Sequence, residues 1–290
     1  MLDLVNLPRL MSVTQGNPEI AIALIDGPVN TSLANFELNT IRDISSDGSG
    51  KCDENHTTAC LHGTLVAGIL IGKRGSGAPA ICPGCTLILR SIFSDKGSEA
   101  NNVPSASAEV LALALFAAID AGARIVNLSC GIARCCGRGE SSLRSALGFA
   151  ASKGVIVVAA AGNQARVGGS CITKHPWVIP VVSIDRAGRA ASDCNLSASI
   201  GQRGLAAPGQ DLLSVSSDGA PARFSGTSAA CPLVTGAAAL LWSEYPSMTA
   251  AQIKEALAGG RRQRSIVPPT MDAWGAFQTL AARANRKRTA

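Results

Sequence analysis

Three residues of this 290-residue chain have the types and the surroundings that nucleophilic acyl transfer requires. Asp26 follows a continuous apolar run, His62 stands at the start of a second apolar segment, and Ser228 stands between a glycine-containing turn and a third. A serine nucleophile needs a base to take its proton, and the base needs a carboxylate to orient it and stabilise its charged form. Asp, His, Ser is also one of the chain orders in which such triads occur. The three residues therefore predict a catalytic triad.

Alternating strand-like and helix-like segments surround these residues. Apolar runs of strand length lie at 20–25, 86–93, 124–129, 155–161 and 177–184, and segments with helical spacing lie at 61–70, 105–121, 140–153, 227–244, 250–257 and 271–284. This order predicts an α/β fold of three layers, in which helices cover both faces of a mostly parallel sheet. Asp26 ends its strand, so we expect it at the carboxyl edge, where open α/β sheets carry their sites.

Ser228 is predicted to lie in the first turn of its helix. Backbone N–H groups without partners and the positive end of the helix dipole favour negative charge there. We also expect a polar surface loop at 30–58 and a small antiparallel ribbon at 205–216, near Ser228. The sequence contains no internal repeat and no low-complexity linker. We therefore divide it into an N-terminal segment, 1–19, one catalytic domain, 20–280, and a basic C-terminal tail, 281–290.

The charge distribution bears on possible partners. The net charge is +6, and the excess lies after residue 260, where Asp272 is the single acidic residue. This basic end is read either as a solvated terminus or as a surface that recruits an acidic peptide. No motif or aromatic context supports nucleic-acid binding. The expected partner is a peptide or protein substrate.

Targeting signals are missing from the sequence as written. No apolar run reaches the roughly 18 residues of a membrane span. The first residues lack the basic start and apolar core of a signal peptide. We expect a cytoplasmic protein without membrane association, and secretion stays the alternative if a leader or propeptide is missing.

Ten cysteines leave several alternatives open. Cys52 and Cys60 could close a surface loop, and Cys82 and Cys85 have the C-x-x-C spacing of redox and zinc sites. A zinc site needs a second ligand pair, which the sequence lacks. Disulfides and free buried thiols are the other interpretations. The segment at 72–77 has no carboxylates for calcium, so we expect neither a metal nor another cofactor.

Four sequence blocks resemble those of the subtilisin-like serine proteases. Residues 226–232, GTSAACP, resemble the family's nucleophile block, and residues 62–68, HGTLVAG, resemble its histidine block. Residues 159–163, AAAGN, and 127–131, NLSCG, are similar to its oxyanion and substrate-strand blocks. The blocks occur in the family's order between residues 20 and 280. The resemblance implies a subtilisin-like fold and a peptidase that works through an Asp-His-Ser triad.

The resemblance also implies the roles of further residues. Asn163 would donate a hydrogen bond to the oxyanion, together with the backbone N–H of Ser228. The substrate-binding walls of the specificity pocket would be Ser129, Cys130, Gly131, Ala160, Ala161 and Gly162.

Two departures from the family pattern narrow the comparison. Residues 26–29, DGPV, stand where most of the family has Asp followed by Ser or Thr and then Gly, and Leu65 replaces a usual histidine. With residues 92–96, IFSDK, the first block looks most like the cytoplasmic proteases that mature cyanobactin-type ribosomal peptides. Relatives that macrocyclise carry an added helical segment between Asp and His. The loop-like composition at that place favours hydrolysis.

Two other functions remain open. The chain could be a general degradative subtilase, or a pseudoprotease that binds peptides without cutting them. Taken alone, Ser228 could be a helix-capping residue and Asp26 a turn residue. Their joint occurrence with His62 is what favours catalysis.

Overall fold

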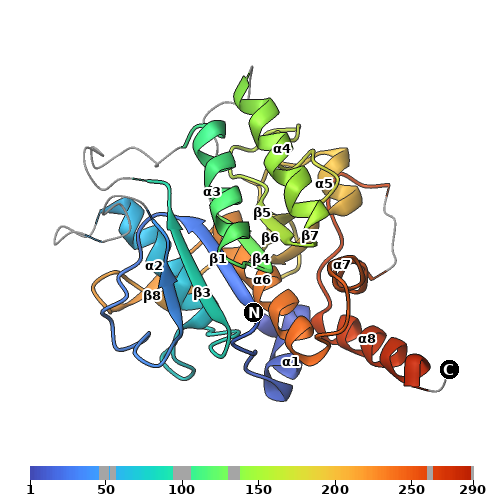
Figure 1. Ribbon diagram of the computed structural model, residues 1–290, viewed down its shortest axis with the longest axis horizontal. Coiled ribbons are helices and arrows are strands. Elements are labelled where there is room, and N and C mark those ends of the chain that lie inside the picture. Colours follow the sequence, from blue (N-terminus) through green and yellow to red (C-terminus); the bar gives the residue numbers. More distant parts are fainter. Residues whose placement is uncertain (46–51, 53–56, 94–105, 130–137, 260–263, 289–290) are drawn as a thin grey trace.

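A seven-stranded parallel sheet forms the centre of the computed structural model (Figure 1). The described residues are 1–45, 52, 57–93, 106–129, 138–259 and 264–288. The strands are β1 (Ala21–Asp26), β2 (Ile41–Asp43), β3 (Thr86–Ser91), β4 (Ile125–Leu128), β5 (Ile156–Ala160), β6 (Val178–Ile184) and β7 (Leu205–Pro208), in the order β2-β3-β1-β4-β5-β6-β7. Every neighbouring pair is parallel. The predicted fold class is confirmed.

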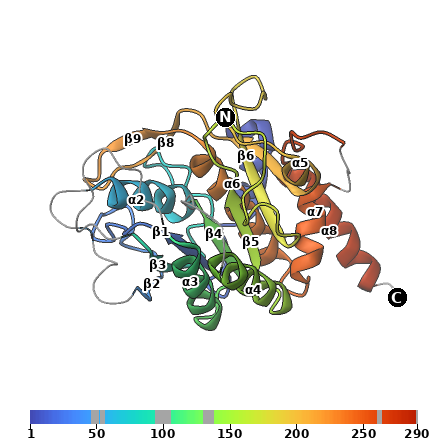
Figure 2. The same ribbon diagram turned by 90° about the horizontal axis from the view of Figure 1, so that it is seen from above.

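Helices cover both faces of this sheet (Figure 2). They are η1 (Leu2–Val5), α1 (Leu7–Val13), α2 (Thr58–Ile71), α3 (Ala108–Asp120), α4 (Arg138–Ser152), α5 (Ala198–Arg203), α6 (Thr227–Glu244), α7 (Ala250–Ala258) and α8 (Ala273–Arg288). Alternate strand residues face opposite ways. Ile22 and Leu24 therefore pack with α2 and α6, whereas Ala23 and Ile25 pack with α3 and α4. Helices α1, α7 and α8 pack against α6 from outside.

The order in which successive strands are added to the sheet reverses at β1. Strand β3 lies on one side of β1, and β4 lies on the other, followed by β5, β6 and β7. Open α/β sheets bind ligands where the strand order reverses, at the carboxyl ends of the strands. Asp26 ends β1 and Ser129 directly follows β4, so both residues lie at this edge.

Two expectations about local structure were wrong. Helix α2 begins at Thr58 because the side chain of Thr57 caps it and accepts the N–H of Cys60, which places His62 in the second turn. The expected ribbon at 205–216 is divided. Its first part is the fully buried strand β7 of the main sheet, and the ribbon itself pairs β8 (Leu212–Val215) with β9 (Pro221–Phe224).

Smaller differences concern the two polar segments. The expected loop at 30–58 contains the short edge strand β2. Much of the expected basic tail, 281–290, belongs to α8, which continues to Arg288. Within the described part of the chain, no helix combines the length and the apolar character that a membrane crossing needs.

Some of the described cysteines form disulfides, and others are free buried thiols. Cys52 and Cys60 form a disulfide, and Cys171 is also disulfide-bonded. The free thiols among the described residues are those of Cys82, Cys85, Cys194 and Cys231, all buried. Cys135 and Cys136 lie outside the described residues.

We predict that Gly27→Ala lowers the free energy of unfolding by about 1–3 kcal/mol. An added Cβ would lie 2.1 Å from the backbone oxygen of Ala59, at the start of α2. Gly148→Ala is the matched control, because nothing lies within 4 Å of an added Cβ in this helical position. This control should raise stability by about 0.5–1 kcal/mol. Denaturant unfolding measures both, and equal effects would contradict the close approach of α2.

Candidate active site

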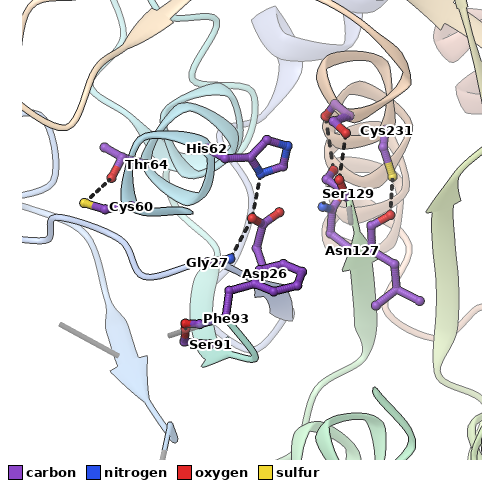
Figure 3. Close-up of polar contacts among 12 residues, drawn as sticks. Asp26, Gly27, Cys60, His62, Thr64, Ser91, Phe93, Asn127, Ser129 and Cys231 are labelled. Atoms are coloured by element: carbon purple, nitrogen blue, oxygen red, sulfur yellow. Dashed lines mark hydrogen bonds and ion pairs between the residues drawn. The ribbon is translucent and has the colours of Figure 1, made fainter. Parts of the chain in front are cut away.

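Asp26 and His62 form a hydrogen-bonded pair at the carboxyl edge of the sheet (Figure 3). Nδ1 of His62 lies 2.6 Å from Oδ1 of Asp26, and the N–H of Gly27 donates to the same oxygen at 2.7 Å. Asp26 is fully buried, whereas the side chain of His62 is 28% exposed. A carboxylate can only accept, so Nδ1 carries the proton, and Nε2 of the neutral imidazole is left as an acceptor.

Two glycines allow α2 to bring His62 to Asp26. An added Cβ at Gly63 would lie 2.4 Å from the oxygen of Pro28, and one at Gly27 would meet Ala59. The backbone after β1 and the backbone of α2 are therefore in direct contact. Gly27 stands where the resembling proteases mostly have Ser or Thr, and this contact leaves no room for such a side chain.

The second oxygen of Asp26 has an unusual environment. Oδ2 is buried and has no hydrogen-bond partner within the described part of the chain. Position 27 offers no hydroxyl, because no side chain fits there. The hydrogen bonds that stabilise this carboxylate therefore converge on Oδ1, the oxygen that faces His62.

The pKa of His62 is raised above its ordinary value. Burial lowers this pKa, but the charge of Asp26 and its hydrogen bond raise it and outweigh the burial. The ring of Phe224 stands edge-on to the imidazole, with 5.3 Å between the ring centroids. His62 is thus held on two sides, as a general base must be.

Ser228 lies in the first turn of α6, as expected. Its Oγ donates to the backbone oxygen of Ser129 at 2.7 Å. No hydrogen bond joins Ser228 to His62 among the described residues. The structure therefore brings Asp26 to His62 and Ser228 to the end of β4. Proton transfer from Ser228 to His62 requires its hydroxyl to leave Ser129 first.

Asn163 is oriented by the start of α6. Its Oδ1 accepts the N–H of Thr227 at 3.0 Å, and Oγ1 of Thr227 accepts the N–H of Gly162 at 3.1 Å. With its oxygen engaged, the amide of Asn163 presents Nδ2, which would lie 2.7 Å from a Cβ at Gly226. This donor therefore lies beside the turn that carries Ser228. The backbone N–H of Ser228 belongs to the first helical turn, where N–H groups have no partner within the helix.

The described residues of the expected pocket walls lie at the ends of neighbouring strands. Strand β4 pairs with β5, with Leu128 opposite Ala159, so Ser129, directly after β4, lies next to Ala160, the last residue of β5. Ser129 and Ala161 are buried, and Ala160 is half-buried. Gly162 follows directly. Cys130 and Gly131 lie outside the described residues.

Other reactive side chains do not join the site. Burial raises the pKa of Cys231 to about 12, and its thiol points to the oxygen of Leu128 at 3.8 Å, so it is inert. His56 lies outside the described residues. Within the described ranges, no three His, Cys, Asp or Glu side chains gather as a metal site would require.

Sequence reasoning missed a buried polar network behind Ser228. Asn127 and Thr235 are fully buried and hydrogen-bonded to each other at 2.8 Å. The available signals were a polar residue inside an apolar strand and a threonine in an Ala- and Leu-rich helix. Pro232, inside the same helix, was a third.

Comparisons with known proteins relate this chain to serine proteases. A model of the Subtilase family matches residues 17–262. A thermophilic serine proteinase from Bacillus sp. (strain AK1) is 32% identical over 80% of this chain and 54% of that protein. Mycosin-3 of Mycobacterium tuberculosis is 29% identical over 91% of this chain and 68% of that protein. The chain thus spans about half the length of the first of these curated relatives.

Two solved structures are similar over almost their whole length. A mutant of the protease domain of PatA has a TM-score of 0.83 and 28% identity, covering 92% of this chain and 97% of that one. The prenylagaramide maturation protease PagA has a TM-score of 0.80 and 26% identity, covering 94% and 98%. The PatG macrocyclase in complex with peptide, 20% identical, shares the fold.

We predict that His62 and His175 titrate on opposite sides of the ordinary histidine pKa. The pKa of His175 is lowered by burial and by the charges of Lys254, Arg144 and Arg203. In Asp26→Asn, burial remains but the charge is lost, so the pKa of His62 should fall below its ordinary value while that of His175 stays unchanged. NMR titration of the imidazole resonances measures both. An unchanged pKa of His62 in this variant would show that Asp26 does not control this pKa.

The raised pKa also sets the sign of a stability effect. The folded state binds the His62 proton more tightly than the unfolded state does. The pair therefore stabilises the fold at low pH and loses this contribution as the pH rises through the pKa of His62.

Proposed function

Because the chain belongs to the subtilase family, we propose that it is a serine endopeptidase in which Asp26, His62 and Ser228 act together. The observation that carries this proposal is the 2.6 Å hydrogen bond between His62 and the buried Asp26. This bond leaves Nε2 of His62 as the acceptor at the edge of the sheet where α6 presents Ser228. A base fixed in this tautomer is what a serine nucleophile requires.

The reaction follows from these positions. The hydroxyl of Ser228 leaves the oxygen of Ser129, gives its proton to Nε2 of His62 and attacks the scissile carbonyl. Asp26 stabilises the imidazolium, and His62 then protonates the leaving amine. Nδ2 of Asn163 and the N–H of Ser228 stabilise the oxyanion. Water then gives a proton to Nε2 of His62 and attacks the acyl-enzyme, and His62 returns the proton to Oγ of Ser228 as the carboxylic acid product leaves.

For the substrate, we propose a ribosomal precursor peptide that is cut and not cyclised. The support is the likeness to the patellamide maturation protease PatA and the prenylagaramide maturation protease PagA. The expected walls Ala160 and Ala161 have small side chains, which leave room beside the substrate strand. General degradation is the alternative, and broad cleavage without sequence preference would identify it.

The proposed location with this substrate is the cytoplasm. The disulfide between Cys52 and Cys60 favours the secreted alternative, because such bonds persist mainly in oxidising compartments. Fractionation of the cells that make the protein distinguishes the two.

We predict that a fluorophosphonate probe labels Ser228 in the wild type and leaves Ser228→Ala unlabelled. Asn163→Ala should lower the catalytic constant on a peptide by about 10²- to 10³-fold, the usual effect of losing one oxyanion donor. Asn39→Ala is the control, because its amide binds Pro83 away from the site and its loss should leave catalysis unchanged. A folded wild type that is not labelled would indicate a peptide-binding pseudoprotease.

We also predict that a peptide library yields linear products with one preferred residue before the cut. Mass spectrometry of the products reports both properties in one experiment. Cyclic products would overturn the preference for hydrolysis.

A further inference from the structure

The carbonyl of the nucleophile lacks its normal helical donor. In an α-helix, the carbonyl of residue i accepts the N–H of residue i+4. For Ser228 that residue is Pro232, which has no N–H. The hydroxyl of Ser129 donates to the oxygen of Ser228 instead, at 3.1 Å. The backbone of the nucleophile is therefore held by a side chain at the end of β4.

The direction of this hydroxyl is set by two more residues. Nδ2 of Asn127 donates to Oγ of Ser129 at 2.9 Å, which leaves the single proton of Ser129 for the oxygen of Ser228. Oγ1 of Thr235 donates to Oδ1 of Asn127 at 2.8 Å and so fixes which end of the amide faces Ser129. Thr235 lies two turns after Ser228 on α6. The chain of donors therefore starts and ends on the same helix.

The directions of these hydrogen bonds matter because the three side chains are buried. Thr235 and Asn127 are fully buried, and Ser129 is 2% exposed. Without the hydroxyl of Thr235, Oδ1 of Asn127 is a buried acceptor without a donor, which is costly. A turn of the amide lets Oδ1 accept the proton of Ser129 but leaves Nδ2 without an acceptor, so either orientation keeps one buried group unpaired. That turn removes the donor from the oxygen of Ser228.

We propose that Thr235 and Asn127 are positioning residues that hold the backbone of Ser228 through Ser129. This proposal rests on the proposed role of Ser228 as the nucleophile. During the reaction the hydroxyl of Ser228 leaves the oxygen of Ser129, and the bond from Ser129 to the oxygen of Ser228 remains. It is this second bond that keeps the first turn of α6 in place beside β4. Thr235 acts without touching the substrate.

The test compares two substitutions at one position with a matched control. Thr235→Val keeps the shape and removes the hydroxyl, whereas Thr235→Ser keeps the hydroxyl. Thr86→Val removes a buried threonine hydroxyl, bonded to the oxygen of Pro18, at the opposite end of the sheet. The rate at which the fluorophosphonate labels Ser228 and the catalytic constants on a peptide are measured. Thermal unfolding shows that each variant is folded.

We expect Thr235→Val to slow labelling and to lower the catalytic constant about five- to tenfold, the effect of one buried hydrogen bond. KM and the pKa of the acid limb of the pH profile should stay unchanged, because the backbone of the substrate strand keeps its place and the pair of Asp26 and His62 is not altered. Thr235→Ser and Thr86→Val should react at the wild-type rate. If Thr235→Val does not fold, Thr235→Ala removes the same hydroxyl in a good helix former and carries the same expectation.

Three results would overturn the proposal while leaving the proposed function intact. They are normal labelling of Thr235→Val, equal slowing of Thr235→Ser, and equal slowing of Thr86→Val. A wild type that is not labelled would remove the proposed function and this inference with it.

Discussion

The burial of α6 is the constraint on which the rest of the structure depends. Its residues Thr227 and Ala229–Trp242 are all buried, against four strands on one side and α1, α7 and α8 on the other. A helix that is apolar all round gains stability only when it is enclosed. Because α6 is fixed so firmly, its first turn can present Ser228 at a defined place, and Asn163, Ser129 and Thr235 all bond to this helix or extend from it.

Much of the fold could be predicted because short apolar runs of strand length alternate with longer helical segments in this chain. The apolar runs at 20–25 and 155–161 have the length of strands and are too short for typical helices, and their alternation with helices indicates a parallel sheet. The ends of the helices and strands were harder to predict. A polar side chain, Thr57, starts α2 earlier than its apolar pattern does. The run at 205–208 joins the main sheet because tertiary burial, which no local pattern records, places it beside β6.

The candidate site could be predicted as far as the chemistry of a serine nucleophile requires particular residue types. A serine nucleophile requires a base and a carboxylate, and the structure places His62 and Asp26 in contact. The network of Asn127, Ser129 and Thr235 was not predictable, because it joins a strand to a helix through side-chain directions that exist only after packing. Its meaning depends on Pro232, which looks like a helix breaker when the sequence is read alone.

The order of the elements along the chain also governs events during synthesis. Asp26, His62 and Asn163 leave the ribosome before Ser228 does, and the strands from β4 to β7 lack the helix that covers one of their faces until α6 emerges. Domains tend to fold as units as their chains are made. A growing chain therefore holds the proposed base and oxyanion donor before it holds the proposed nucleophile or a closed core. The proposed peptidase activity therefore cannot begin before Ser228 and α6 have emerged from the ribosome.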